Sequence, residues 1–116
     1  MYGFPSQTVL SKFNGKCLIA ITLSANTISF SFDDNMSITC EKEFKLCNTN
    51  REPIDIYIPL ENASISNLLQ QSVSNIIKDT DMLLYIQFSN GSKLILEDDD
   101  KYESFHFKIG NKEIHV

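Results

Sequence analysis

Basic residues are scarce in this sequence, which has ten Lys and Arg residues against fifteen Asp and Glu residues in 116 positions. The net charge of −5 argues against direct binding of nucleic acid, because a protein that binds the phosphate backbone needs a basic face that releases counterions. Cysteines are few as well, and the three present have no paired short spacing and no CxxC zinc signature. This usage favours a reducing compartment over a disulfide framework.

Long apolar runs are also missing. No segment approaches the roughly 20 apolar residues that a membrane-spanning helix needs. Residues 1–10, MYGFPSQTVL, lack the basic stretch followed by an apolar stretch that marks a secretory signal. We therefore expect a cytoplasmic protein that does not enter a membrane. The hydrophobic content of 42%, with eight Phe, is enough for the core of a single domain over residues 1–116.

Strict alternation of apolar and polar residues runs through most of the chain, and it predicts half-buried strands because successive side chains of a strand point to opposite faces. In 27–32, TISFSF, the three apolar residues Ile28, Phe30 and Phe32 share one face. The same period recurs at Ile54, Ile56 and Ile58, at Leu84, Ile86 and Phe88, at Leu94 and Leu96, at Phe105, Phe107 and Ile109, and at Ile114 and Val116. Asn, Asp and Gly lie between these runs, as hairpin turns require. The pattern predicts a mainly β domain (α+β) of antiparallel hairpins.

One segment has a helical period instead. Ile65, Leu68 and Leu69 lie at i, i+3 and i+4 after Asn62, which is a suitable N-cap. We expect one short amphipathic helix over about 62–71, packed against the sheet or across one end of it.

The two halves of the sequence have similar patterns. Residues 13–41 align without gaps on 69–97 at an offset of 56, and apolar positions coincide although identities are few. The alignment predicts two similar β-meander units, although any two meanders with similar turns share this much pattern. Two such units fit a curved antiparallel sheet or a small barrel, which also deals with exposed sheet edges.

Candidate catalytic groups are few. Cys17 and Cys40 share the strand phase of apolar neighbours and are expected in the core, whereas Cys47 is expected in a loop without a base beside it. His106 and His115 fall on the outward phase of adjacent strands, where two histidines can bind a metal, but a solvated strand face explains them without a ligand. We expect no catalytic residue, no cofactor and no metal, and therefore no enzyme.

The richest feature is the acidic run Glu97, Asp98, Asp99 and Asp100, which lacks the alternating oxygen spacing of a calcium-binding loop. A solvated turn is one interpretation. The other is a negative patch for a basic protein partner, formed by this run together with Tyr102, Glu103, Asp33 and Asp34. On this second interpretation Glu97 to Asp100, Tyr102 and Glu103 lie at one rim of the domain, where the charges of the run project together into solvent.

Several segments carry a family resemblance. They are 68-LLQQSV-73, 83-LLYIQFSNGSKLIL-96 and 102-YESF-105 in the second half, and 13-FNGKCLIAI-21 and 28-ISFSFDDNMSI-38 in the first. The pattern resembles a family of small bacterial β-rich domains of uncharacterised function, which includes immunity proteins of contact-dependent growth inhibition and other polymorphic toxin systems. Gln71 stands near a position where the family prefers Gly, and Asn90 stands where it has Asp.

The resemblance implies an immunity protein that binds and neutralises a cognate toxin domain, with no catalytic residues to carry over. A nuclease toxin is the expected partner of this acidic chain. Nuclease toxins are usually basic, because their substrates are polyanions. The alternative from another class is a non-catalytic β-domain that binds a small ligand or has a structural role.

Overall fold

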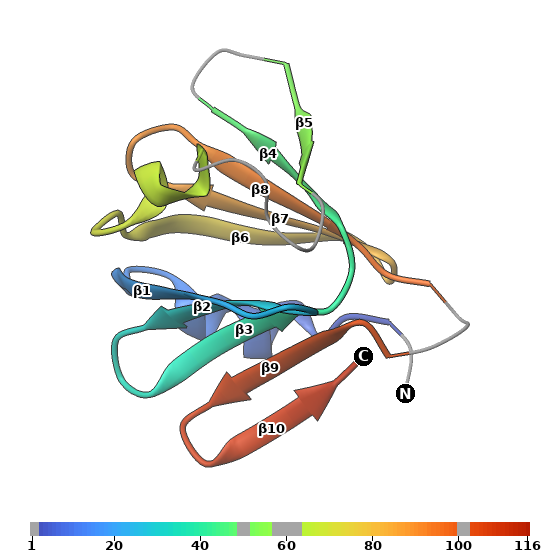
Figure 1. The fold of residues 1–116 in the computed structure, drawn as a ribbon. Coiled ribbons are helices and arrows are strands. Elements are labelled where there is room, and N and C mark those ends of the chain that lie inside the picture. The colour runs from blue at the N-terminus through green and yellow to red at the C-terminus, as the bar shows by residue number, and fades with distance from the viewer. Residues whose placement is uncertain (1–2, 49–51, 57–63, 100–102) are drawn as a thin grey trace.

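The computed structural model describes residues 3–48, 52–56, 64–99 and 103–116. They form ten strands in two five-stranded antiparallel sheets, which Figure 1 shows as a lower and an upper layer. The lower sheet has the order β1-β2-β3-β9-β10, with bounds Leu18–Leu23, Ile28–Phe32, Met36–Cys40, Phe105–Ile109 and Lys112–His115. The upper sheet has the order β5-β4-β8-β7-β6, with bounds Ile54–Ile56, Phe44–Cys47, Lys93–Glu97, Leu83–Phe88 and Val73–Thr80.

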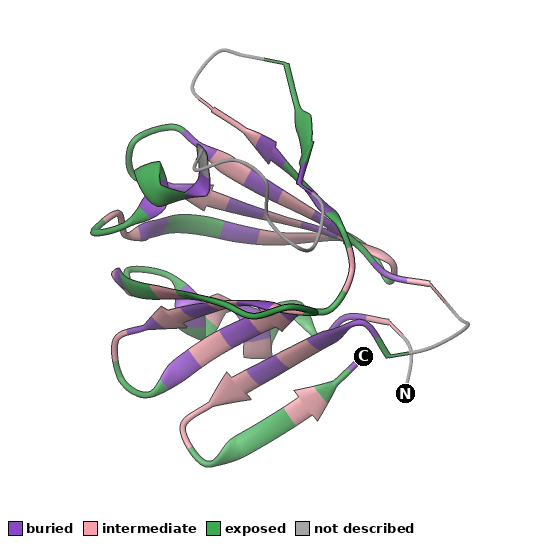
Figure 2. Ribbon diagram, in the orientation of Figure 1, coloured by how far each residue is buried: buried purple, intermediate pink, exposed green. Residues whose placement is uncertain are grey.

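The alternating pattern of the sequence reappears as alternating burial. In β2 and β3 every second side chain is buried, and Figure 2 shows these strands as alternating purple and pink bands. The buried side chains of both sheets belong to a single hydrophobic cluster, and Phe30 of β2 meets Phe44 of β4 with 5.7 Å between ring centroids. The prediction of a mainly β fold of antiparallel hairpins is therefore confirmed.

The two sheets do not close into a barrel, so the small-barrel alternative is wrong. Cys17 and Ser72, the residues just before edge strands β1 and β6, form an antiparallel bridge between the two sheets. Further along β6 the side chain of Gln7 occupies the edge, because its amide nitrogen donates to the carbonyl of Ile76 at 2.6 Å and its oxygen accepts from the N–H of Lys78 at 2.7 Å. A side chain from outside the sheet thus takes the hydrogen bonds that a neighbouring strand would need for closure.

Helical structure is short. The chain begins with α1 (Gln7–Leu10), in which Ser6 caps the N–H of Val9, followed by the 3-10 helix η1 (Ser11–Phe13). The helix expected over 62–71 is a 3-10 helix, η2 (Ser64–Leu68), within the described residues, and its suggested cap Asn62 lies outside them. Ile65 and Leu68 are buried three residues apart, whereas Leu69 is 39% exposed, because a 3-10 helix has three residues per turn and ends before it.

The two halves of the chain have the same element order, a helical turn, a three-stranded meander and a hairpin. Equivalent backbone bonds join them: Leu18 N–H donates to Gln71 O at 2.9 Å as Val73 N–H donates to Lys16 O at 2.9 Å. Gly15 N–H donates to Val73 O at 2.8 Å as Gln70 N–H donates to Leu18 O at 2.8 Å. These reciprocal pairs relate the halves by an approximate two-fold axis through the Cys17–Ser72 bridge. Duplication of an ancestral unit stays a prediction.

A β-bulge at the start of β1 and of β6 changes the offset at which the two halves align. β1 and β6 each carry a register shift at the same place, between Leu18 and Ala20 and between Val73 and Asn75. Leu18 therefore corresponds to Val73, at an offset of 55, and the offset of 56 holds only from β2 onward. The bulge also breaks the expected phase of β1, so that Leu18 is buried while Ile19 is 59% exposed and Cys17 is only half-buried.

The halves exchange their hairpins. After β3 the chain leaves the lower sheet, and β4 pairs with β8 of the upper sheet, while after β8 the chain returns and β9 pairs with β3. The register of β4 on β8 matches the register of β9 on β3. Leu46 lies opposite Leu94 in the first pair, and Phe107 lies opposite Ile38 in the second. Strand β4, which ends at Cys47, was not expected from the sequence, and Cys47 lies at the end of a strand and not in a loop.

Candidate functional site

The acidic stretch at the end of β8 divides into exposed and buried positions. Glu97 is exposed, and its Oε1 lies 3.7 Å from Lys45 Nζ of β4. Asp99 Oδ2 lies 3.3 Å from Lys42 Nζ, and Glu103 is exposed at the approach to β9. Two expected contact residues, Asp100 and Tyr102, lie outside the described residues.

Asp98 does not project into solvent, so the expectation that all these acids face outward is wrong for this residue. It is 8% exposed, its Oδ2 accepts from the N–H of Gly3 at 2.8 Å, and its own N–H donates to the carbonyl of Met82 at 2.9 Å. Its Oδ1 is buried without a hydrogen-bond partner in the described part of the chain. Asp98 therefore fastens the N-terminal segment to the end of β8.

Asp33 and Asp34 do not join the acids that follow β8. They form the turn before β3, whereas Glu41, just after β3, donates its N–H to Ser104 O at 2.8 Å. The five residues of β3 separate the two groups by about 17 Å at the usual rise of a strand. Figure 1 shows the β2–β3 turn and the end of β8 at opposite sides of the molecule.

Both turn acids have partners of their own. Asp33 Oδ2 accepts from the N–H of Cys17 at 3.0 Å, and Ser89 Oγ accepts from the N–H of Ser72 in the same way in the other half. Asp34 forms an ion pair with Lys16 and adopts a positive φ of 62°. These interactions give the two aspartates a structural explanation, and the single negative patch expected from the sequence is wrong for them.

The exchange of hairpins brings two chain crossovers together, one from β3 to β4 and the other from β8 to β9. The Lys42–Asp99 ion pair and the hydrogen bond from Glu41 to Ser104 join them directly. We call this surface the crossover rim, and its described charged residues are Glu41, Lys42, Glu43, Glu97, Asp99 and Glu103. It carries five carboxylates and Lys42, and Lys45 of β4 lies beside it as the ion-pair partner of Glu97.

Glu41 and Glu43 are the rim residues that sequence reasoning missed. They lie more than fifty positions before the acidic run in the sequence, and only the crossover places them beside it. One signal was present, because Glu41 falls on Glu97 when the two halves are aligned.

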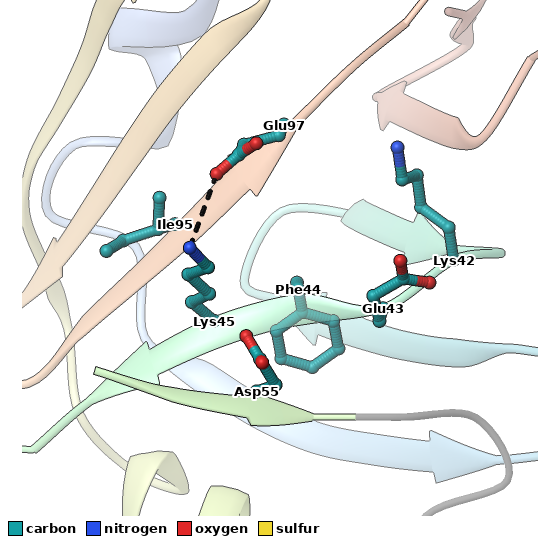
Figure 3. Close-up of a pocket in the computed structure, with 7 residues that line it drawn as sticks. All are labelled: Lys42, Glu43, Phe44, Lys45, Asp55, Ile95 and Glu97. Atoms are coloured by element: carbon teal, nitrogen blue, oxygen red, sulfur yellow. Dashed lines mark ion pairs between the residues drawn. The ribbon is translucent and has the colours of Figure 1, made fainter.

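A shallow hollow of about 180 Å³ opens between the rim and strands β4, β5 and β8. Its lining residues are Lys42, Glu43, Phe44, Lys45, Asp55, Ile95 and Glu97. Figure 3 shows the Lys45 side chain reaching across it toward Glu97, with the carboxylates of Glu43 and Asp55 nearby. The hollow therefore presents mixed charge on a surface and not an enclosed apolar pocket of the kind that holds a drug-sized ligand.

His106 and His115 lie opposite each other on β9 and β10, as the sequence suggested. Their rings stack with centroids 3.9 Å apart and planes at 21°, and Glu113 Oε1 lies 3.4 Å from His106 Nε2 without the geometry of a hydrogen bond. Stacked rings direct their nitrogen lone pairs along parallel planes, whereas a shared metal needs converging ones. Among the described residues no group of three or more His, Cys, Asp or Glu is placed to hold a metal ion.

The buried cysteine is unsuited to nucleophilic chemistry. Cys40 is fully buried in β3, and burial raises the pKa of its thiol far above its usual value because desolvation penalises the thiolate.

Comparison of the chain with protein-family models, with curated proteins and with solved structures found no match. In the parts of the chain that the structure covers, no helix has the length and apolar character required to span a bilayer.

Proposed function

We propose that this chain is a bacterial immunity protein that acts in the cytoplasm, where it binds and neutralises a cognate toxin domain and catalyses no reaction. The observation that carries the proposal is the crossover rim, where five carboxylates gather at the junction that contains Glu103, Ser104 and Phe105, the described residues of the 102–105 segment that resembles the family. A basic nuclease is the partner whose chemistry fits this surface. No cofactor is needed for inhibition by binding.

Charge explains how such an inhibitor meets its target in time. A toxic nuclease must be captured before it reaches nucleic acid, and opposite charges on two proteins accelerate their encounter. The nuclease surface that attracts a polyanion also attracts the crossover rim. Lys42 and Lys45 hold Asp99 and Glu97 in place by ion pairs, so the rim keeps a defined arrangement before the toxin arrives.

The structure changes which residues are proposed as contacts. The rim residues Glu41, Glu43, Glu97, Asp99 and Glu103 replace the patch that included Asp33, Asp34 and Asp98. Asp100 and Tyr102 stay predicted contacts on the strength of the sequence.

We expect the open reading frame next to the gene for this chain to encode the toxin domain, and the experiment measures binding kinetics with that domain. We expect Glu97→Lys to slow association several-fold and to weaken its dependence on salt, because charges at an interface rim act mainly on the association rate and are screened over about 10 Å at 0.1 M salt. Surface plasmon resonance at several ionic strengths provides the rates.

Glu113→Lys on β10 is a matched control. The side chains of Glu97 and Glu113 are 57% and 56% exposed, and each lies close to one cationic or titratable partner, Lys45 or His106. The two reversals change the net charge equally, but only Glu97 belongs to the crossover rim. Equal slowing by both variants would assign the effect to total charge, and no slowing by Glu97→Lys would remove the rim from the binding surface.

A further inference from the structure

Each sheet ends in two edge strands, and one of the four differs from the others. Edge strands β5, β6 and β10 contain charged residues, namely Asp55 in β5, Lys78 and Asp79 in β6, and Lys112 and Glu113 in β10. Charged side chains on an edge oppose pairing with another chain. Strand β1, Leu-Ile-Ala-Ile-Thr-Leu, has none, and the sequence contains no charged residue between Lys16 and Asp33.

β1 also exposes large apolar side chains. Ile19 is 59% exposed and Leu23 is 55% exposed, and they are the two most exposed of the four large apolar residues that lie on the surface of the described structure. The equivalent positions on β6, at the offset of 55, are the polar residues Ser74 and Lys78. Strands β1 and β6 are equivalent under the two-fold relation, and of these two edges only β1 is apolar at the compared positions.

The two edges also differ in what lies against them. Gln7 binds the backbone of β6 at Ile76 and Lys78, and Lys78 Nζ donates to the carbonyl of Phe4 at 2.9 Å. On β1 the backbone hydrogen bonds to the described residues of the other half end at Leu18. The stretch from Ile19 to Leu23 is the part of β1 beyond those bonds.

We propose that β1 is a self-association edge, at which two copies of this chain pair their β1 strands antiparallel about a two-fold axis. A second copy fits this edge because an uncharged strand brings no like charges into opposition in any register, whereas a partner recognised by complementary charge finds no charge to pair with. Pairing is isologous, so the exposed apolar residues of one copy meet those of the other. It joins two lower sheets into one continuous sheet.

The length of the edge sets the strength of the dimer. Six residues span about 20 Å, so the buried area falls below the roughly 1,200 Å² of a stable interface, and association is weak and concentration-dependent. We expect half of the chains to pair at a concentration between about 10 µM and about 1 mM.

Sedimentation velocity of the purified full chain tests the proposal. The wild type is expected to change from monomer to dimer as its concentration rises to about 1 mM, and a monomer throughout this range overturns the proposal. Ala20→Lys places a cation on β1 and is expected to raise the dissociation constant by at least about tenfold, because like charges then face each other across the axis.

Asn75→Lys is the matched control, because Ala20 and Asn75 are both exposed and are the equivalent residues just after the bulges of β1 and β6. It is expected to leave the dimer unchanged. Thr22→Lys, exposed on the same strand, replaces Ala20→Lys if circular dichroism shows that the first variant does not fold. The assignment to β1 is overturned if the dimer persists in the β1 variant. It is also overturned if the variants on β1 and β6 weaken the dimer equally.

Discussion

Replacing either Phe32 or Phe88 by alanine is expected to lower the free energy of unfolding by about 3–5 kcal/mol. Both rings are 2% exposed, and they occupy equivalent positions at the ends of β2 and β7, opposite Leu18 and Val73. The Phe32 ring also packs edge-on against Phe13 with 5.5 Å between centroids. Removing a ring leaves a cavity that the surrounding sheet cannot refill. Urea unfolding followed by circular dichroism measures the loss.

Ile19→Ala is the control for these two variants, since Ile19 is apolar but 59% exposed. Its truncation is expected to change the free energy of unfolding by less than about 1 kcal/mol, as surface substitutions do. A loss below about 1 kcal/mol for Phe32→Ala or Phe88→Ala would contradict the assignment of that ring to the core.

The second large effect is expected at Asp98. Asp98→Ala removes the carboxylate that accepts from Gly3 and leaves that N–H without its acceptor, at a cost of about 1–3 kcal/mol in the free energy of unfolding. The N-terminal segment that this bond fastens also carries Phe4, whose ring packs against Phe105 at 5.5 Å between centroids. Urea unfolding provides the number, and amide hydrogen exchange at Gly3 and Phe4 is expected to speed up.

Two further variants distinguish anchoring from simple charge. Asp98→Asn keeps an oxygen acceptor for Gly3 and is expected to lose less than Asp98→Ala. Asp99→Ala removes the neighbouring carboxylate and its ion pair with Lys42, which is worth about 0–1 kcal/mol at a partly exposed site. If Asp99→Ala destabilises the chain as much as Asp98→Ala does, the anchoring role of Asp98 is wrong.

Most strands were predictable because the alternation of apolar and polar residues is visible within a few neighbouring positions. Ile28, Phe30 and Phe32 alternate with polar residues, and the core needs only their shared face. The bulge in β1 was not predictable, because the apolar residues on both sides of it, from Leu18 to Ile21, hide the change of phase. Strand β4 was missed for a similar reason. Its four residues are too few to show a period, and β4 is identified by its pairing with β8.

The candidate site was only partly predictable, since its geometry depends on the exchange of hairpins. The sequence drew attention to Glu97, Asp99 and Glu103, but it gave Asp98 the same role as its neighbours. The partner of Asp98 is the N–H of Gly3, which lies 95 positions away in the chain. Glu41 and Glu43 reach the same surface only because β4 leaves the sheet of β3.

The most direct test of the proposed function is a titration of the toxin domain's nuclease activity with the purified chain. At toxin concentrations well above a nanomolar dissociation constant, activity is expected to fall in proportion to added chain and to vanish at one chain per toxin, because inhibition by tight binding is stoichiometric. Full nuclease activity in a large excess of the folded wild-type chain would contradict the proposal that this protein is the toxin's inhibitor.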